Sequence, residues 1–117
     1  MKKIIKISKI FKKDENKANK KISEQNYKTA YVDTLFDHPE AVPVVIEKAV
    51  VILKDKYGFI ISKNHRGIYV YDPKNSVIVG EELDILVRRM KIYKDALEVS
   101  SYEIINEHGT KDISENL

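Results

Sequence analysis

The stretch ISKNHRGIYVYDP, residues 61–73, carries the clearest local fold signal in the chain. Two runs that favour β-structure flank a polar connector, in which Asn64 and Gly67 supply turn chemistry. The pattern therefore predicts a β-hairpin with a cationic tip. The side chains at that tip are Lys63, His65 and Arg66.

Alternation in the second strand of this hairpin separates two kinds of side chain. If Ile68 and Val70 face the core, Tyr69 and Tyr71 share the opposite face, because successive strand residues point to opposite sides. Two tyrosines beside a basic tip suit single-stranded nucleic acid, with rings stacking on bases and cations near phosphates. The tip would also suit a wing laid against duplex backbone. The structural alternative is that the tyrosines pack as good strand residues and the basic tip protects the sheet edge.

Before the hairpin, the sequence predicts a helix that begins near Pro43 and stops at Gly58. The apolar residues follow helical spacing, and proline is tolerated in a first turn. Many of these residues are β-branched, so a strand is the competing interpretation. The apolar residues concerned are Val45, Ile46, Ala49, Ile52 and Leu53.

After the hairpin, a short third strand is expected at 76–79, and then two helices. The sequence GEEL at 80–83 predicts the start of a long helix, since glutamates suit a first turn and apolar residues recur at i, i+3, i+4 and i+7. A capping box at 100–103 and a stop at Gly109 predict a short helix over 101–108.

This order of elements predicts an α+β fold. We expect a small three-stranded antiparallel sheet with two to three helices packed on one face, of which a winged-helix-like arrangement is one form. The expected organisation is a basic flexible arm at 1–28, a single α+β domain at 29–109 and a frayed tail at 110–117.

Basic residues gather at two places besides the hairpin. Residues 1–28 hold ten lysines against three carboxylates, a formal charge of +7, so the remaining residues sum to −4. Such an arm fits attraction to a polyanion or a solubilising tail. The second cluster, at the end of the expected long helix, suits phosphate contact or a helix dipole. Its members are Arg88, Arg89, Lys91 and Lys94.

Composition excludes several classes of protein. The 117 residues include no cysteine, which excludes disulfides and thiolate metal sites and favours a reducing cytoplasm. No apolar run approaches the roughly 18–20 residues of a membrane span, and lysines interrupt the apolar residues near the start, unlike in a signal peptide. The sequence therefore predicts a cytoplasmic protein without a membrane partner.

The residue patterns of common active sites are also missing from the sequence. It has no glycine-rich phosphate loop and no serine in a Gly-x-Ser-x-Gly turn. The three histidines are scattered, so no metal site is expected. We therefore expect a protein that is not an enzyme and needs no cofactor.

Three short motifs resemble a known family segment. GIYVYD at 67–72, GEEL at 80–83 and EII at 103–105 are similar, in this order, to the segment ahead of the helicase motor in primase–helicases of phages, plasmids and archaeal mobile elements. The resemblance covers about residues 44–108 and implies a strand at the first motif and helices at the other two. It implies a role in handling template DNA or docking a primase to a helicase. It implies no catalysis, because the primase part and the ATPase motor have no counterpart in this sequence.

The features together predict a non-catalytic nucleic-acid-binding accessory protein in replication of a virus, plasmid or other mobile element. Its expected partners are DNA, single-stranded or duplex, and a primase or helicase. The residues expected at the interface are Lys63, His65, Arg66, Tyr69, Tyr71, Arg88, Arg89 and Lys91. The alternative is a protein–protein module, an assembly subunit or an inhibitor of a host enzyme, that uses the same anchors and an open sheet edge. An oligomer is compatible with either.

Overall fold

The computed structural model describes residues 27–113. The predicted basic arm therefore lies almost entirely outside the described residues, as do the last four residues of the predicted tail. No helix within 27–113 is long and apolar enough to cross a membrane.

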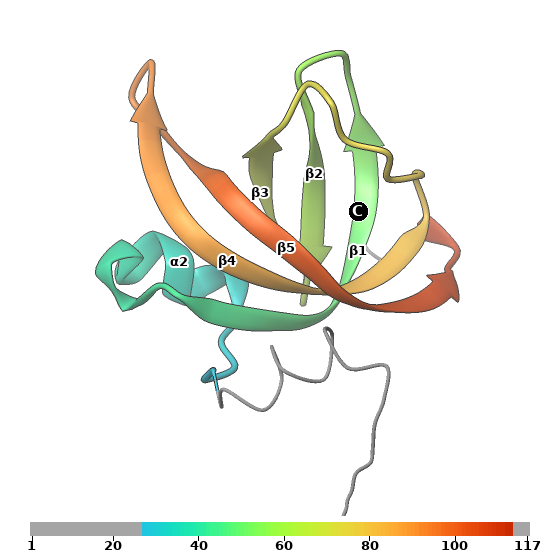
Figure 1. Ribbon diagram of the computed structural model, residues 1–117, viewed down its shortest axis with the longest axis horizontal. Helices are drawn as coiled ribbons and strands as arrows, with labels where there is room; N and C mark the ends of the chain where they lie inside the picture. Colours follow the sequence, from blue (N-terminus) through green and yellow to red (C-terminus); the bar gives the residue numbers. More distant parts are fainter. Residues whose placement is uncertain (1–26, 114–117) are drawn as a thin grey trace, which may run out of the picture.

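The described chain is mostly β-strand. In chain order its elements are the helix α2 (Val32–Asp37), the 3-10 turn η1 (Pro39–Ala41), and the strands β1 (Val44–Lys54), β2 (Gly58–Lys63), β3 (Arg66–Tyr71), β4 (Glu81–Tyr93) and β5 (Ala96–Thr110). The strands close into a barrel in the order β1-β2-β3-β5-β4, with β4 returning to β1 (Figure 1). All neighbours are antiparallel except β3 and β5, which run parallel. This order is the connectivity of the OB-fold, a five-stranded Greek-key barrel.

The prediction of an α+β fold with a three-stranded sheet is wrong. The helix expected from Pro43 is the strand β1, in which β-branched side chains pack on the pleated surface of a sheet. The long helix expected from 80 is β4, and the short helix expected over 101–108 lies within β5. The helix starts that the family resemblance implied at 80–83 and 103–105 are therefore strand residues.

A period of two explains β4. Leu83, Ile85 and Val87 point into the core, whereas Glu82 and Asp84 alternate with them on the outer side. The helix was predicted from an overlapping set, Leu83, Leu86, Val87 and Met90, which recurs at i, i+3, i+4 and i+7. Pairing with β1 on one side and β5 on the other decides the outcome, because a strand in a closed barrel satisfies its backbone groups on both edges.

The hairpin predicted around residue 64 is confirmed. β2 and β3 pair in an unbroken antiparallel register, and Asn64 and His65 form the two-residue turn with φ values of 55° and 63°. Positive φ at both central positions matches the twist of the flanking strands. Ile68 and Val70 lie in the core, and Tyr71 on the other face is 40% exposed. The alternation in β3 was therefore predicted correctly.

The core fills the barrel, and α2 closes one end of it. Phe59, Ile61 and Val70 are fully buried, and Val32 and Leu35 of α2 join the same cluster. A second, smaller cluster outside the barrel joins Val45, Leu86 and Ile105.

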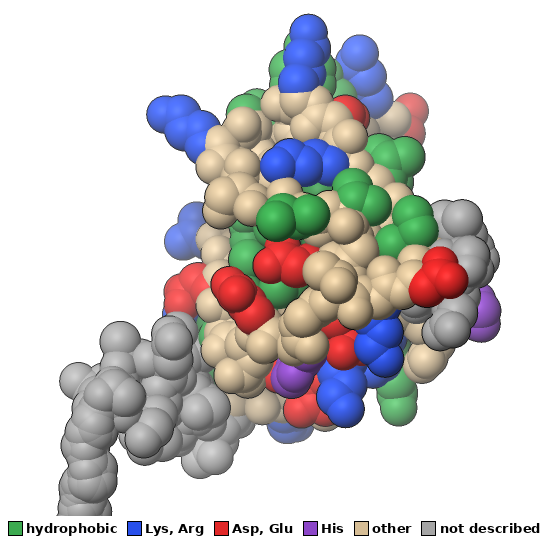
Figure 2. All heavy atoms as spheres, turned by 90° about the vertical axis from the view of Figure 1, so that its right-hand side faces the viewer, with side chains coloured by type: hydrophobic (Ala, Val, Ile, Leu, Met, Phe, Trp, Pro, Cys, Tyr) green, Lys and Arg blue, Asp and Glu red, His purple; other side chains and the backbone are tan. Residues whose placement is uncertain are grey.

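The connection between β3 and β4 is irregular, so the third strand expected at 76–79 is wrong. Val77 is buried, but Ile78 and Val79 are 62% and 41% exposed. Lys54 fixes this connection by donating a hydrogen bond from Nζ to the Val77 carbonyl, at 2.8 Å. Figure 2 faces this side of the barrel and shows hydrophobic, acidic and basic side chains mixed together rather than one continuous basic surface.

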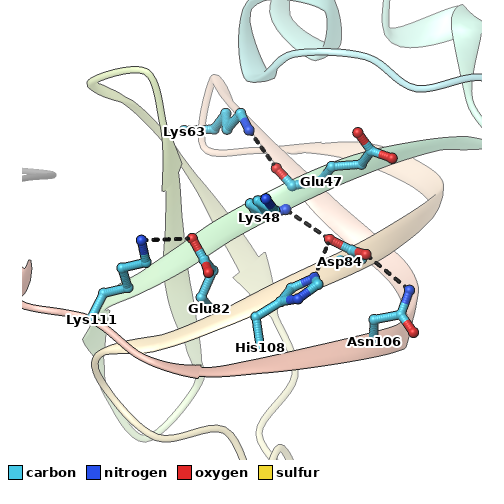
Figure 3. A network of polar contacts seen from close by, with 8 residues as sticks. All are labelled: Glu47, Lys48, Lys63, Glu82, Asp84, Asn106, His108 and Lys111. Carbon is cyan, nitrogen blue, oxygen red and sulfur yellow. Dashed lines mark hydrogen bonds and ion pairs between the residues drawn. The ribbon is translucent and has the colours of Figure 1, made fainter.

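A bulge in β1 depends on one buried carboxylate. Ile46 and Ala49 pair with Ile85 and Leu83, so β1 carries one residue more than β4, and Lys48 has a φ of 55°. The Asp84 carboxylate accepts the freed Lys48 N–H at 2.9 Å (Figure 3). The same carboxylate accepts a hydrogen bond from Asn106 Nδ2 at 2.9 Å and lies 2.9 Å from His108 Nε2. Burial raises the pKa of Asp84, but these three partners outweigh burial and lower it overall.

We predict that Asp84→Asn lowers the free energy of unfolding at neutral pH by about 2 kcal/mol, because hydrogen bonds to an ionised group are lost from a buried site. A carboxylate with a lowered folded-state pKa contributes its full stability above its unfolded-state pKa of about 4. That contribution disappears as the pH falls through the lowered value. The difference in the free energy of unfolding between wild type and variant, measured by denaturant unfolding, should therefore disappear in acid.

The control is Glu107→Gln, which alters an exposed carboxylate on the neighbouring strand β5. We expect its stability to match wild type within about 0.5 kcal/mol. An Asp84→Asn variant as stable as wild type at neutral pH would contradict the role assigned to this carboxylate.

Candidate functional site

A hollow of the described surface lies between the β1–β2 loop and the β4–β5 hairpin, with β3 between them. It is a cleft of about 670 Å³. Its lining is aromatic and basic, with one acid: Tyr57, Tyr69, Tyr71, Lys91, Tyr93, Lys94 and Glu98. The cleft exists because β3 and β5 pair at one position only, Val70 with Val99, so the β4–β5 ribbon diverges from β3 beyond that point (Figure 1).

Asp55 shapes the wall made by the β1–β2 loop. Its carboxylate accepts hydrogen bonds from the backbone N–H groups of Tyr57 and Gly58, at 2.9 and 3.0 Å, and from the Tyr69 hydroxyl at 2.7 Å. The bond from Tyr69 contributes most to lowering the pKa of Asp55. One acidic side chain therefore joins the loop to β3 and holds Tyr57 at the edge of the cleft.

Gly58 lets the loop turn directly against β3. A Cβ atom at this position would lie 2.1 Å from the Val70 carbonyl oxygen, which no real side chain tolerates. Glycine at this position thus fixes how closely the β1–β2 loop approaches the cleft.

The β4–β5 hairpin makes the opposite wall. Lys94 and Asp95 form its two-residue turn, with φ values of 50° and 65°. The ring of Tyr93 is 52% exposed, and Lys94 Nζ lies 5.4 Å from its centroid. Lys91 Nζ lies 3.9 Å from the Tyr71 centroid and 5.6 Å from the Tyr93 centroid. Lysine ammonium groups therefore lie over two rings of the cleft in the ligand-free protein.

The Tyr69 hydroxyl is fixed by Asp55. Burial raises the pKa of the Tyr69 phenol, and the hydrogen bond to Asp55 raises it further. The hydroxyl therefore stays protonated and donates to Asp55, while the side chain lines the cleft.

The structure brings together three of the eight residues predicted at the interface. Tyr69, Tyr71 and Lys91 line the cleft. The predicted tip residues lie at the other end of β3, beside α2. Arg66 pairs with Asp33 at 2.6 Å and stacks on the Phe36 ring at 4.3 Å.

The other predicted cations also lie away from the cleft. Lys63 Nζ donates to the Glu47 carbonyl at 2.8 Å (Figure 3), and His65 is exposed in the hairpin turn. Arg88 forms an ion pair with Glu103. Arg89 is exposed and lines a separate shallow groove beside η1.

Sequence reasoning missed Tyr57, Tyr93 and Glu98, and it placed Lys94 in a basic cluster at the end of a helix. The errors at 93–98 arose because β4 and β5 were expected to be helices, so 94–95 was not recognised as a hairpin turn. The signal was present: Tyr93, Lys94 and Asp95 follow a long apolar run, and Asp tolerates the left-handed conformation that the turn needs. Within 27–113 no three His, Asp or Glu side chains gather as metal ligands.

Comparison with known proteins adds no assignment. The sequence matches no family model, and neither a curated protein nor a solved structure matches it significantly. The resemblance to primase–helicases therefore stays a prediction.

We predict that Asp55→Ala loosens the β1–β2 loop without unfolding the barrel, because three hydrogen bonds to the loop and to Tyr69 are lost. Amide hydrogen exchange at Tyr57 and Gly58 should accelerate, while exchange in the β2–β3 ladder stays slow. Asp37→Ala, at an exposed carboxylate of α2, should leave loop exchange unchanged. Unaltered exchange in Asp55→Ala would show that other contacts hold the loop.

Proposed function

We propose that this protein binds single-stranded nucleic acid in the tyrosine-lined cleft, without catalysis. The observation that carries the proposal is the convergence of four tyrosines and two lysines from three separate elements on one hollow. Aromatic platforms with nearby cations are the general solution for holding unpaired bases and their phosphates. The site lies on β3 and the β1–β2 and β4–β5 loops, which is the surface that OB-fold proteins use for oligonucleotides and oligosaccharides.

The energetics favour a stacked base over the lysine that occupies its place. A cation over an exposed ring contributes about 0.5–1 kcal/mol. Stacking of a base on an aromatic side chain contributes about 1–3 kcal/mol. A base can therefore displace Lys91 from Tyr71, and the freed ammonium can then bind an acceptor group of the strand.

The charge of the cleft separates nucleic acid from neutral sugar chains. Lys91 and Lys94 line it, and Lys56 lies over the Tyr57 ring at 5.1 Å. A neutral oligosaccharide forms no ion pair with these ammonium groups, whereas a phosphate of a nucleic-acid strand can form one. The lysine-rich residues 1–28 add further attraction for a polyanion.

Unpaired strands suit this site better than a duplex. A duplex keeps the faces of its bases inside the stack, so tyrosine rings can stack only on bases that are splayed out. The cations assigned earlier to a duplex-binding wing, Lys63 and Arg66, are engaged by Glu47 and Asp33.

The resemblance to primase–helicases supports a place in replication of a mobile element, where single strands are exposed, with a primase or helicase as the neighbouring protein. The rival, a protein–protein module, relied on the same anchors and on an open sheet edge. Closure of the described strands into a barrel limits that edge to the part of β3 and β5 beyond their single pairing position, so strand addition is the weaker proposal.

We predict that Tyr71→Ala and Tyr93→Ala each weaken binding of a thymidine 9-mer by roughly tenfold, measured by fluorescence anisotropy, because each removes one stacking platform. Tyr71→Phe should bind like wild type, since stacking needs the ring and not the hydroxyl. Tyr31→Ala removes an exposed ring on the far side of the barrel and serves as the control. No binding by wild type at low salt would refute the proposed function.

We further predict that affinity falls steeply with salt and that Lys94→Ala lowers the slope of log K against log salt by about 0.7, the loss of one phosphate contact to a single strand. Lys63→Ala should leave the slope unchanged, because its ammonium is engaged away from the cleft. If Lys63→Ala lowered the slope and Lys94→Ala did not, the interface would lie at the tip of the β2–β3 hairpin and not in the cleft.

A further inference from the structure

One acidic side chain in the cleft forms an ion pair with its cross-strand neighbour Lys91 but has an oxygen that accepts no hydrogen bond among the described residues. Glu98 lies on β5, is 9% exposed and lines the hollow between the tyrosines. Its Oε1 atom is buried and accepts no hydrogen bond within the described part of the chain. The nearest cation, Lys91 Nζ, is 3.9 Å away, beyond hydrogen-bond distance.

The Tyr69 hydroxyl is already engaged. It donates its proton to Asp55, so it does not satisfy Glu98. A buried carboxylate oxygen without a donor costs free energy that a bound ligand could recover. Lys91 lies beside both Glu98 and the Tyr71 ring, so a base that displaces Lys91 from this ring would open the Glu98 carboxylate to a ligand donor.

We infer that Glu98 selects guanine in the bound strand. This inference rests on the proposed function and adds base preference to it. An ionised carboxylate can only accept hydrogen bonds, so it recognises the donors on the edge of a base. Guanine places two donors side by side on its Watson–Crick edge, N1–H and the N2 amino group, which match the two oxygens of one carboxylate.

The other bases fit a carboxylate less well. Adenine and cytosine each present one amino group beside a ring nitrogen that accepts, and thymine presents one N–H between two carbonyls. In each case a second carboxylate oxygen faces a lone pair and is repelled. Lys91, next to Glu98, completes the complement, because its ammonium can donate to the O6 atom that adjoins guanine N1. Lys91 and Glu98 together therefore present one donor and two acceptors. These complement, in order, the O6 atom, the N1–H group and the N2 amino group of guanine.

The test compares wild-type protein on thymidine 9-mers that carry one central guanine, adenine, cytosine or thymine. We expect the guanine strand to bind roughly tenfold tighter than the other three, the scale of a two-bond base contact. Central 7-deazaguanine keeps the Watson–Crick edge and should match guanine. Central inosine keeps N1–H but lacks the N2 amino group, and should fall between guanine and adenine. A uridine 9-mer with one central guanine shows whether the preference extends to RNA.

Matched variants assign the preference to one side chain. Glu98→Gln is nearly isosteric and replaces one acceptor by a donor, so it should lose the preference for guanine. Glu103→Gln, on the same strand but paired with Arg88 outside the cleft, should keep the guanine preference. The inosine comparison needs no variant, so it decides the matter even if Glu98→Gln fails to fold.

The outcomes separate this inference from the proposed function. Equal binding of all four strands by wild type, or a guanine preference that survives in Glu98→Gln, would overturn base selection while single-strand binding stands. Absence of binding to every strand would overturn both.

Discussion

Pairing of β1 with two different strands is the constraint on which the rest of the molecule depends. The first half of β1 pairs with β4 and the second half with β2, so this one strand closes the barrel. A straight strand cannot serve both neighbours, and the bulge at Lys48 supplies the necessary bend. The bulge leaves the backbone N–H of Lys48 without a partner in the sheet, and the Asp84 carboxylate accepts its hydrogen bond. A single carboxylate thus supports the curvature that every other element follows.

Closure at β1 determines where the barrel opens on the opposite side. Because β4 is committed to β1, the β4–β5 ribbon can touch β3 only briefly, at Val70 and Val99. The gap beyond that contact is the cleft. Side chains from β3, from the β1–β2 loop and from the β4–β5 hairpin meet there although they are distant in sequence. The concentration of aromatic rings is therefore a product of topology, and no single stretch of sequence contains it.

Local patterns in the sequence predicted what local pairing controls. The β2–β3 hairpin follows from turn residues and alternation within about a dozen positions, and both tyrosines of β3 were placed on the correct face. The strands β1 and β4 were expected to be helices because apolar residues in them recur at helical spacing, and part of β5 was expected to be a helix because of a capping box at 100–103 and a stop at Gly109. Glu82 and Asp84 illustrate the reason: outward polar residues between inward apolar ones mark a strand, but they also suit the first turn of a helix. Only partners far along the chain decide between these alternatives, and Glu98 and Tyr93 could not be placed in a common site before that decision.

The rigidity of the β4–β5 wall has a kinetic consequence. This wall is a paired ribbon that ends in a two-residue turn, and the facing loop is held by Asp55. Within residues 27–113 no segment has to open or fold over an occupant, so encounter alone would govern entry past these two walls. Differences in affinity between ligands would then arise from their dissociation rates. The protein would discriminate between ligands by their residence times in the cleft.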